Sequence, residues 1–401
     1  MAADVLTPKD ESEAAAMIRS AAEASRSLRI EGGGSKAGLG ADIHADQILS
    51  TRALAGIVAY NPAEMVMSAR AGTPLAEIEA ALAGSRQMLA FEPVDLRNVL
   101  GNRAEPTIGG VFATNLSGPR RLVAGAARDS LIGVRLVNGA GEIVKSGGRV
   151  MKNVTGLDIV KLMAGSYGTL GLMSEVTFKV LPRPERAVTI LLAGTDETHA
   201  ASLMARMMAT SLEVSGAAYL PESCRGRFLH GAFKDGGVLA FRIEGLGFSV
   251  AERAGKLVGL LAAEGIIDRL EDDETRMLWQ EIRDAKPFQS HREKPLWRVS
   301  VAPSAGASLI NRLRLETGVD GYLDWQGGLL WLQMEAEPEA DILRSLIKAN
   351  GGGHATLIRA RPLQKAENPV FEPQSPAVEA LSRRIREKFD RRGIFNPGLM
   401  G

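Results

Sequence analysis

A stretch from Thr107 to Arg121, TIGGVFATNLSGPRR, constrains the fold of this chain more than any other feature. It lies within residues 101–171, which contain 14 of the 44 glycines. Ordering glycine costs conformational entropy, so such a cluster needs a reason, such as positive φ angles or a close approach of backbone to a ligand. Because the neighbouring sequence is strongly apolar, we expect a glycine loop built into a packed domain.

A second glycine-rich segment, GGGSKAG at residues 32–38, follows a short strand expected at residues 28–31. Taken alone, it fits a ligand loop and a loose turn about equally well. The longer stretch lacks the lysine of a P-loop, but oriented backbone N–H groups and short polar side chains can wrap a pyrophosphate. Two such loops, about 75 residues apart and both at strand edges, predict a long ligand lying across a sheet.

Bulk composition limits the classes of function. A length of 401 residues favours two domains, and 45% hydrophobic with 24% charged residues is typical of a globular chain. A net charge of +1 gives no reason to expect nucleic acid as a partner. The acidic, polar N-terminus and the lack of an apolar run of about 18 residues lead us to expect a cytoplasmic location.

Cysteine and histidine counts limit the redox groups. Cys224 is the single cysteine, which excludes an intrachain disulfide and a protein-held iron–sulfur cluster. The five histidines are widely scattered, so we expect no metal site.

The order of expected elements divides the chain into an α+β protein of two parts and a tail. Residues 1–185 begin with a helix at 10–25, continue with a helix that Thr73 would cap, and contain a hairpin, IGVRLVNGAGEIVKSGG. Residues 186–370 alternate strands and helices in a way that suits an α+β cap of paired split βαβ units. Residues 371–401 form a final helix, capped by Ser375, and a pinned IFNPG turn.

Four segments in this order resemble one known family: RIEGGGSKAG, PTIGGVFATNLSGPRR, GSYGTLGLMSEVTFKVLPRPE and GIFNPG. They are similar to the FAD-binding flavoproteins of the vanillyl-alcohol oxidase and p-cresol methylhydroxylase type, and within these to the FAD-binding subunits of bacterial glycolate oxidase. The resemblance covers nearly the whole chain. It implies a PCMH-type FAD-binding domain of two α+β subdomains in residues 1–185, a cap over 186–370, and a C-terminal segment that returns to the FAD domain.

The resemblance also implies which residues hold FAD. The loop at residues 32–35 would contact the pyrophosphate, and the loop at residues 107–118 would contact both the pyrophosphate and the ribityl chain. Residues 168–175 would line the adenosine, and Asn396 would lie beside the isoalloxazine ring. These residues are Gly32, Gly33, Gly34 and Ser35; Thr107, Gly109, Gly110, Thr114, Asn115, Ser117 and Gly118; Gly171 and Glu175; and Asn396. Some relatives have, in the first loop, a histidine bonded to the flavin. Ser35 stands there in this chain, so we expect non-covalent FAD.

The function implied is oxidation of glycolate or a similar small 2-hydroxy acid. His354 is the candidate base, and Arg298 and Arg359, on expected cap strands, are candidates for binding the substrate carboxylate, with surface salt bridging as the alternative for both arginines. The resemblance implies a larger FAD-linked sister subunit and an iron–sulfur subunit as partners, through which alone the chain would reach the membrane.

Two other functions stay open. The H-x-G-D-G-N segment of larger 2-hydroxy-acid dehydrogenases is missing, which favours an accessory electron-transfer or assembly subunit whose sister subunit oxidises the substrate. The chain would otherwise be a self-contained oxidase of another alcohol or sugar acid. Neither GxGxxG nor GxSxG occurs, which argues against a nicotinamide dehydrogenase and a serine hydrolase.

Overall fold

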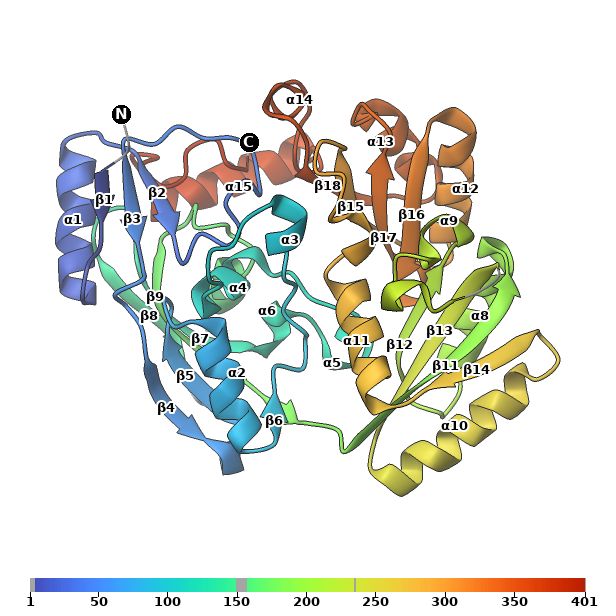
Figure 1. The fold of residues 1–401 in the computed structure, drawn as a ribbon. Coiled ribbons are helices and arrows are strands. Elements are labelled where there is room, and N and C mark those ends of the chain that lie inside the picture. The colour runs from blue at the N-terminus through green and yellow to red at the C-terminus, as the bar shows by residue number, and fades with distance from the viewer. Residues whose placement is uncertain (1–3, 149–156, 234–235, 401) are drawn as a thin grey trace.

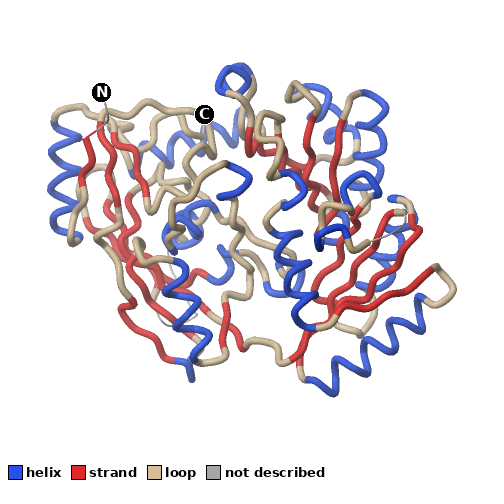
Figure 2. Tube along the Cα trace, viewed as in Figure 1, coloured by secondary structure: helices blue, strands red, loops and turns tan. Residues whose placement is uncertain are grey.

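Two halves, each built on its own sheets, lie side by side in the computed structural model, which describes residues 4–148, 157–233 and 236–400 (Figure 1). Strands of the first half come from residues 4–182 and those of the second half from 186–359. Figure 2 shows the two groups of strands separated by helices and loops. No helix within the described residues is long and apolar enough to cross a bilayer.

A small parallel sheet opens the first half, in the order β1 (Asp4–Leu6), β3 (Gln47–Ser50), β2 (Leu28–Glu31). Helix α1 (Glu11–Glu23) covers it, and the Asp10 side chain caps this helix by accepting hydrogen bonds from two backbone amides. The apolar face of α1 packs against Leu28 and Leu49, so the helix predicted at residues 10–25 is confirmed.

An antiparallel sheet of five strands forms the rest of this half. Its order is β4 (Ile57–Asn61), β5 (Val66–Arg70), β9 (Leu172–Lys179), β7 (Leu131–Val137) and β8 (Ile143–Gly147), and the predicted hairpin is β7–β8. Helix α2 (Leu75–Gly84) packs on it. The predicted cap of this helix was wrong: the Thr73 hydroxyl donates instead to the backbone carbonyls of Arg70 and Gly56, which leaves Pro74 at the helix start.

The glycine-rich stretch contains a helix that the sequence analysis did not expect, α4 (Ile108–Thr114). Thr107 is its N-cap and Asn115, at a φ of 50°, ends it. Its buried side chains Ile108 and Phe112 join the core of the antiparallel sheet. Gly109 explains part of the glycine content, because a Cβ there would lie 2.7 Å from the Ala71 side chain.

The second half is one antiparallel sheet in the order β14-β11-β13-β12-β16-β17-β15-β18. Each four-strand part follows the split βαβ order, strand–helix–strand–strand–helix–strand, which confirms the predicted cap. The first part is β11 (Arg186–Thr195), α8 (Glu197–Met208), β12 (Val214–Leu220), β13 (Gly237–Gly245), α10 (Gly247–Leu261) and β14 (Ile266–Leu270). The second part is β15 (Leu296–Val301), α12 (Gly306–Glu316), β16 (Val319–Asp324), β17 (Leu329–Met334), α13 (Ala340–Ala349) and β18 (Gly353–Arg359).

The two faces of this sheet have different covers. Helices α8, α10, α12 and α13 bury one face, while the other faces the first half and is covered partly by α11 (Asp272–Arg283). Shorter elements complete the chain: β6 (Gln87–Met88), α3 (Arg97–Leu100), α5 (Arg121–Ala124), α6 (Ala127–Ser130), α7 (Ile159–Met163), β10 (Leu181–Pro182) and α9 (Glu222–Arg225).

The C-terminal chain returns to the first half through α14 (Pro362–Glu367) and α15 (Pro376–Phe389). The Leu28 amide donates to the Ile394 carbonyl at 2.7 Å, which places the IFNPG turn beside β2. The predicted cap of this helix was wrong, because Ser375 makes no side-chain cap bond. The spacing of Val378, Leu381, Ile385 and Phe389 also predicts a buried apolar stripe, but Val378 and Leu381 are 45% and 53% exposed.

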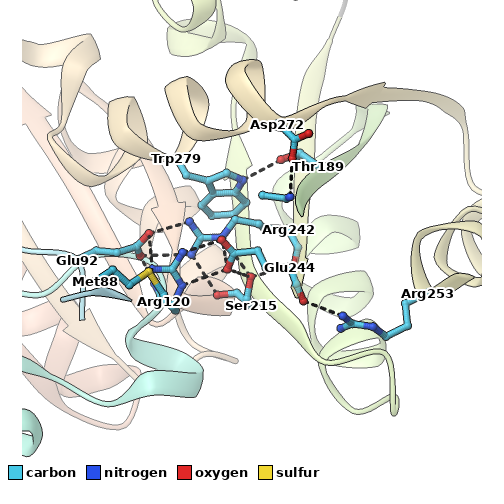
Figure 3. A network of polar contacts seen from close by, with 11 residues as sticks. Met88, Glu92, Arg120, Thr189, Ser215, Arg242, Glu244, Arg253, Asp272 and Trp279 are labelled. Carbon is cyan, nitrogen blue, oxygen red and sulfur yellow. Dashed lines mark hydrogen bonds and ion pairs between the residues drawn. The ribbon is translucent and has the colours of Figure 1, made fainter. Parts of the chain in front are cut away.

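A buried network of charges fixes the two halves against each other (Figure 3). Glu92, from the first half, pairs with Arg242 of β13 at 2.8 Å, and Arg120, also from the first half, pairs with Glu244 of β13 at 2.6 Å. Burial alone would raise the pKa of Glu244, but Arg242 and Arg120 outweigh it and lower the pKa to about 2. Glu244 is therefore charged at neutral pH, and its ion pair with Arg120 joins β13 to the first half.

Candidate functional site

A cleft of about 690 Å³ lies in the first half, with α14 along one side. Both glycine-rich segments line it, together with the turn at Tyr167 and Gly168 and the C-terminal residues Asn396 and Leu399. Its volume is in the range of small-molecule and cofactor sites. Segments more than 350 residues apart in sequence thus meet around one space.

The first glycine loop presents unused N–H groups. Arg52 and Asn102 donate to the carbonyls of Gly33 and Gly34 at 2.6 and 2.7 Å, which fixes the direction of these peptides. In the described part of the chain, the amides of residues 32–35 donate to no protein acceptor. Successive free amides of this kind form an anion-binding concavity.

Close packing explains why this loop requires glycine. A Cβ on Gly32 would overlap the Thr107 hydroxyl, and one on Gly33 would overlap the Glu105 carbonyl oxygen. The two glycine-rich segments therefore touch each other at the floor of the cleft. At Gly110, by contrast, a Cβ would fit without a clash, in ordinary van der Waals contact 3.5 Å from the Thr107 hydroxyl and 4.0 Å from the Lys36 ammonium.

Lys36 brings a positive charge that the sequence analysis missed. Its side chain lines the cleft, and among the described residues it forms no ion pair. Burial lowers its pKa to about 8, with a raising effect from Asp95 and a lowering one from Arg97. Its position directly after GGGS could have indicated a role in the site, but the sequence analysis assigned only the uncharged residues Gly32, Gly33, Gly34 and Ser35 to the cofactor. His44 was also missed, and it lines the outer part of the cleft.

Comparisons with known proteins identify the family. A model of the FAD binding domain matches residues 2–147. The glycolate oxidase subunit GlcE of Escherichia coli (strain K12) is 36% identical over 374 residues, which are 93% of this chain and 92% of that protein. The chain belongs to the FAD-binding, PCMH-type flavoprotein family. FAD is the cofactor of this flavoprotein, and the family is one of FAD-linked oxidoreductases.

Solved structures agree on the fold. The 4-ethylphenol oxidase from Gulosibacter chungangensis, in its isoeugenol complex, superposes with a TM-score of 0.72 at 14% identity, covering 99% of this chain and 88% of that one. The p-cresol methylhydroxylase with substrate bound gives a TM-score of 0.68 at 13% identity, with the same coverage of both chains. The fold class and the family inferred from the four motifs are thus confirmed.

The cleft of this flavoprotein fits FAD. Free amides in a row and the ammonium of Lys36 suit a pyrophosphate, and the space beside Gly110 leaves room for its oxygens. Most residues proposed for FAD line the cleft: Gly32, Gly33, Gly34, Ser35, Thr107, Gly109, Gly110, Thr114, Gly171 and Asn396. These are the residues that we propose hold the cofactor.

Four of the proposed FAD residues do not line the cleft, and the structure gives them other partners. The Asn115 side chain accepts from the Arg128 amide, and the Ser117 hydroxyl accepts from the Ala127 amide. A Cβ on Gly118 would lie 2.8 Å from side-chain atoms of Arg283 and Glu92, so close packing explains this glycine. Glu175 lies within β9 between Arg70 and Arg135. For these four, contact with FAD stays a prediction from the resemblance, and the structure places none of them in the lining of the cleft.

Asn396 lines the cleft, but its side chain forms hydrogen bonds to the backbone of the protein. Its Oδ1 accepts from the Ile30 amide at 2.9 Å, and its Nδ2 donates to the Tyr167 carbonyl at 2.7 Å. It also adopts a left-handed φ of 43°. Asn396 therefore fastens the C-terminal turn to β2 and to the turn at Tyr167, which shapes the wall of the cleft.

Arg359 is not available for a substrate, which corrects its candidacy. Its Nε and both terminal nitrogens donate to four backbone carbonyls: Lys294, Val99, Phe288 and His291. Four of the five N–H groups of a guanidinium are thus occupied. Because Val99 belongs to the first half, Arg359 ties the cap to the FAD domain.

Arg298, unlike Arg359, has a guanidinium with no hydrogen-bond acceptor among the described residues. It is 9% exposed, its Nε is buried without an acceptor, and its guanidinium lies 4.8 Å from the ring centre of Trp325. Burial, and then the charge of Arg121, lower its pKa to about 10. A buried guanidinium with open donors is suited to bind an anion.

His354 lies outside the cleft. It is an exposed residue near the start of β18 and borders a separate surface hollow with Arg344, Lys348 and Glu372. Burial, and then the charges of Arg298 and Arg121, lower its pKa. The structure therefore does not bring His354 to the glycine loops, but it places the imidazole in the field of Arg298.

Non-covalent attachment of FAD is a testable expectation at Ser35, which lies buried in the cleft. A serine cannot form the histidyl bond of the covalent relatives. Precipitation of the holoprotein with acid should therefore release all the yellow colour into the supernatant. Flavin that stays with the protein pellet would contradict this.

Lys36→Met should weaken FAD binding by about tenfold or more, because a charge-assisted contact to phosphate is lost. In the unsubstituted protein, affinity for FAD should fall as pH rises through about 8, where free Lys36 loses its proton. Titration of apoprotein with FAD at several pH values measures both. The exposed Lys145→Met is the matched control, and an equal affinity and pH profile for the two variants would refute the role of Lys36.

Proposed function

We propose that this chain is the FAD-binding subunit of a complex that oxidises glycolate or a similar small 2-hydroxy acid. The observation that carries the proposal is the 36% identity over 93% of the chain with a glycolate oxidase subunit, together with a cleft that suits FAD. Because that relative is named as a subunit of glycolate oxidase, it supports the proposal that this chain also works within a hetero-complex. The buried, unpaired Arg298 supports an acidic substrate.

The reaction would remove a hydride from C2 and a proton from the hydroxyl group of the substrate, which together are two electrons and two protons. Bound FAD supplies the acceptor for the hydride that leaves C2. Arg298 would hold the substrate carboxylate by charge-assisted hydrogen bonds and so fix the direction of C2. His354 would accept the hydroxyl proton as the carbonyl forms, and its lowered pKa keeps it neutral at pH 7, as a base must be.

Electrons would leave the chain through a partner. A single cysteine cannot ligate an iron–sulfur cluster, so an iron–sulfur subunit beside the larger FAD-linked sister subunit is the proposed acceptor. The basic residues of α15 and the following turn, from Arg383 to Arg392, are a proposed docking surface. One of them, Arg392, donates to the Ala22 carbonyl, and Arg383, Arg384, Lys388 and Arg391 are further exposed members of this surface.

An accessory electron-transfer or assembly role is the second candidate, and one observation favours it. The only base proposed from the sequence, His354, is exposed and lies outside the cleft. An assay with glycolate and an artificial electron acceptor separates the two functions. Turnover by the FAD-loaded chain alone supports the catalytic role, whereas turnover that requires the sister subunit supports the accessory one.

His354→Ala should slow flavin reduction by glycolate by about 10²-fold or more and leave FAD content unchanged, because only the base is lost. With His354 present, the rate should fall as the pH drops through the lowered pKa of His354, because the imidazole is then protonated. Rapid anaerobic mixing measures this rate. His230→Ala, at another exposed histidine of the cap, is the control. Equal rates of flavin reduction in the two variants would show that another group is the base.

A further inference from the structure

The two arginines that end the glycine-rich stretch have different surroundings. Arg120 forms ion pairs with Glu92 and Glu244 at 3.4 and 2.6 Å. Arg121, the next residue, is exposed, and its side chain forms no hydrogen bond or ion pair within the described part of the chain. Arg120 therefore locks the loop in place, and the guanidinium of Arg121 is left with open donors.

Arg121 does not extend freely into solvent. Its guanidinium lies 4.4 Å from the ring centre of Trp325, the ring that Arg298 faces at 4.8 Å. The Trp325 indole N–H donates to the Gly118 carbonyl at 3.0 Å, so this cap residue is anchored to the first half close to Arg121. Both guanidinium groups therefore lie close to the centre of one ring, one from each half.

Such a pair is costly without a counter-charge. Arg298 has no carboxylate within ion-pair distance among the described residues, and its Nε is buried without an acceptor. Burial lowers the pKa of both arginines, and the charge of Arg121 lowers that of Arg298 further. Asp129 offsets part of this effect at Arg121, and Asp324 offsets part of it at Arg298. Stacking on an aromatic ring offsets only part of the cost of bringing like charges together. An anion between the two would supply the missing charge and the missing acceptors.

We propose that Arg121 and Arg298 are the two arms of a clamp for a small carboxylate anion, one arm from the FAD domain and one from the cap. The clamp deepens the proposed function, on which it rests for its ligand, a 2-hydroxy acid. Tyr167 connects it to the cofactor site, because this residue lines the cleft and also packs against the cap core that contains Trp325. Arg121 would thus be a specificity-determining residue.

Arg121→Gln tests the clamp with little risk to folding, since the side chain is exposed and forms no hydrogen bond. The FAD-loaded protein is titrated calorimetrically with oxalate, which cannot be oxidised by hydride loss, and anaerobically with glycolate. Loss of one charged arm should raise the Kd for both acids by about tenfold or more. Arg128→Gln, at an exposed arginine on the neighbouring α6, is the matched control and should bind as the unsubstituted protein does.

This experiment distinguishes a wrong clamp from a wrong proposed function, because anion binding tests the clamp and flavin reduction by glycolate tests the function. Equal Kd values for Arg121→Gln and Arg128→Gln, or no binding of either acid by the unsubstituted protein, would overturn the clamp, whether or not glycolate reduces the flavin. Binding of oxalate that depends on Arg121, in a protein whose flavin glycolate does not reduce, would support the clamp and remove the proposed oxidation.

Discussion

Replacing Gly110 by valine should lower FAD content at least tenfold while the chain stays folded. The new side chain would start in the open space of the cleft, 3.5 Å from the Thr107 hydroxyl and 4.0 Å from the Lys36 ammonium. That is the space into which we place the pyrophosphate, and a branched side chain would exclude it. The measurement is the ratio of flavin to protein absorbance after purification, with circular dichroism as the check on folding.

Gly259→Val is the control for Gly110→Val. Gly259 is an exposed glycine within α10, and a Cβ there meets no atom within 4 Å. The Gly259→Val substitution makes the same change in helix propensity at a site far from the cleft. Full flavin occupancy in Gly110→Val would mean that the phosphates lie elsewhere, and the FAD placement proposed here would then be wrong.

Glu92→Ala should destabilise the protein by about 3–5 kcal/mol, the usual cost of removing one partner from a buried ion pair. Glu92 pairs with Arg242 at 2.8 Å and with Arg120 at 3.4 Å, and the side chain of Arg242 is 3% exposed (Figure 3). Without Glu92, Glu244 is the one ion-pair partner left to these two guanidinium groups among the residues that the structure describes. Chemical denaturation of the FAD-loaded protein gives the free energy of unfolding.

The control for Glu92→Ala is Glu252→Ala, which removes an exposed partner of Lys256 on α10 and should change stability little. A loss of less than about 1 kcal/mol for Glu92→Ala would show that the charges at the interface are well solvated. The interface between the halves would then depend on apolar contacts and on hydrogen bonds such as those of Arg359 and Trp325.

Patterns that repeat locally could be read from the sequence. The helix at Glu11–Glu23, the β7–β8 hairpin and the split βαβ order of the cap each leave a periodic or turn signal within a short window. The family could be inferred because four short motifs occur in one order. The helix α4 was missed because its glycines lower helix propensity, whereas its buried Ile108 and Phe112 stabilise it through tertiary packing.

Roles that depend on distant partners could not be read from the sequence. Arg298 and Arg359 are both arginines on adjacent cap strands, yet one is buried with open donors and the other bonds to four carbonyls, including that of Val99, 260 residues away. Arg120 and Arg121 are neighbours in sequence, yet only Arg120 meets the carboxylates of the interface. Lys36 looked like part of a flexible loop until the fold placed its ammonium beside Gly110.

The most direct test of the central proposal is an anaerobic titration of the FAD-loaded chain, assembled with its partner subunits, with glycolate. We expect the oxidised flavin absorbance of this chain to bleach in proportion to the glycolate added, with glyoxylate formed in equal amount. The Arg298→Ala variant in the same complex should bleach far more slowly while it keeps its FAD. Flavin that stays oxidised in this chain while the complex as a whole consumes glycolate would contradict a catalytic role.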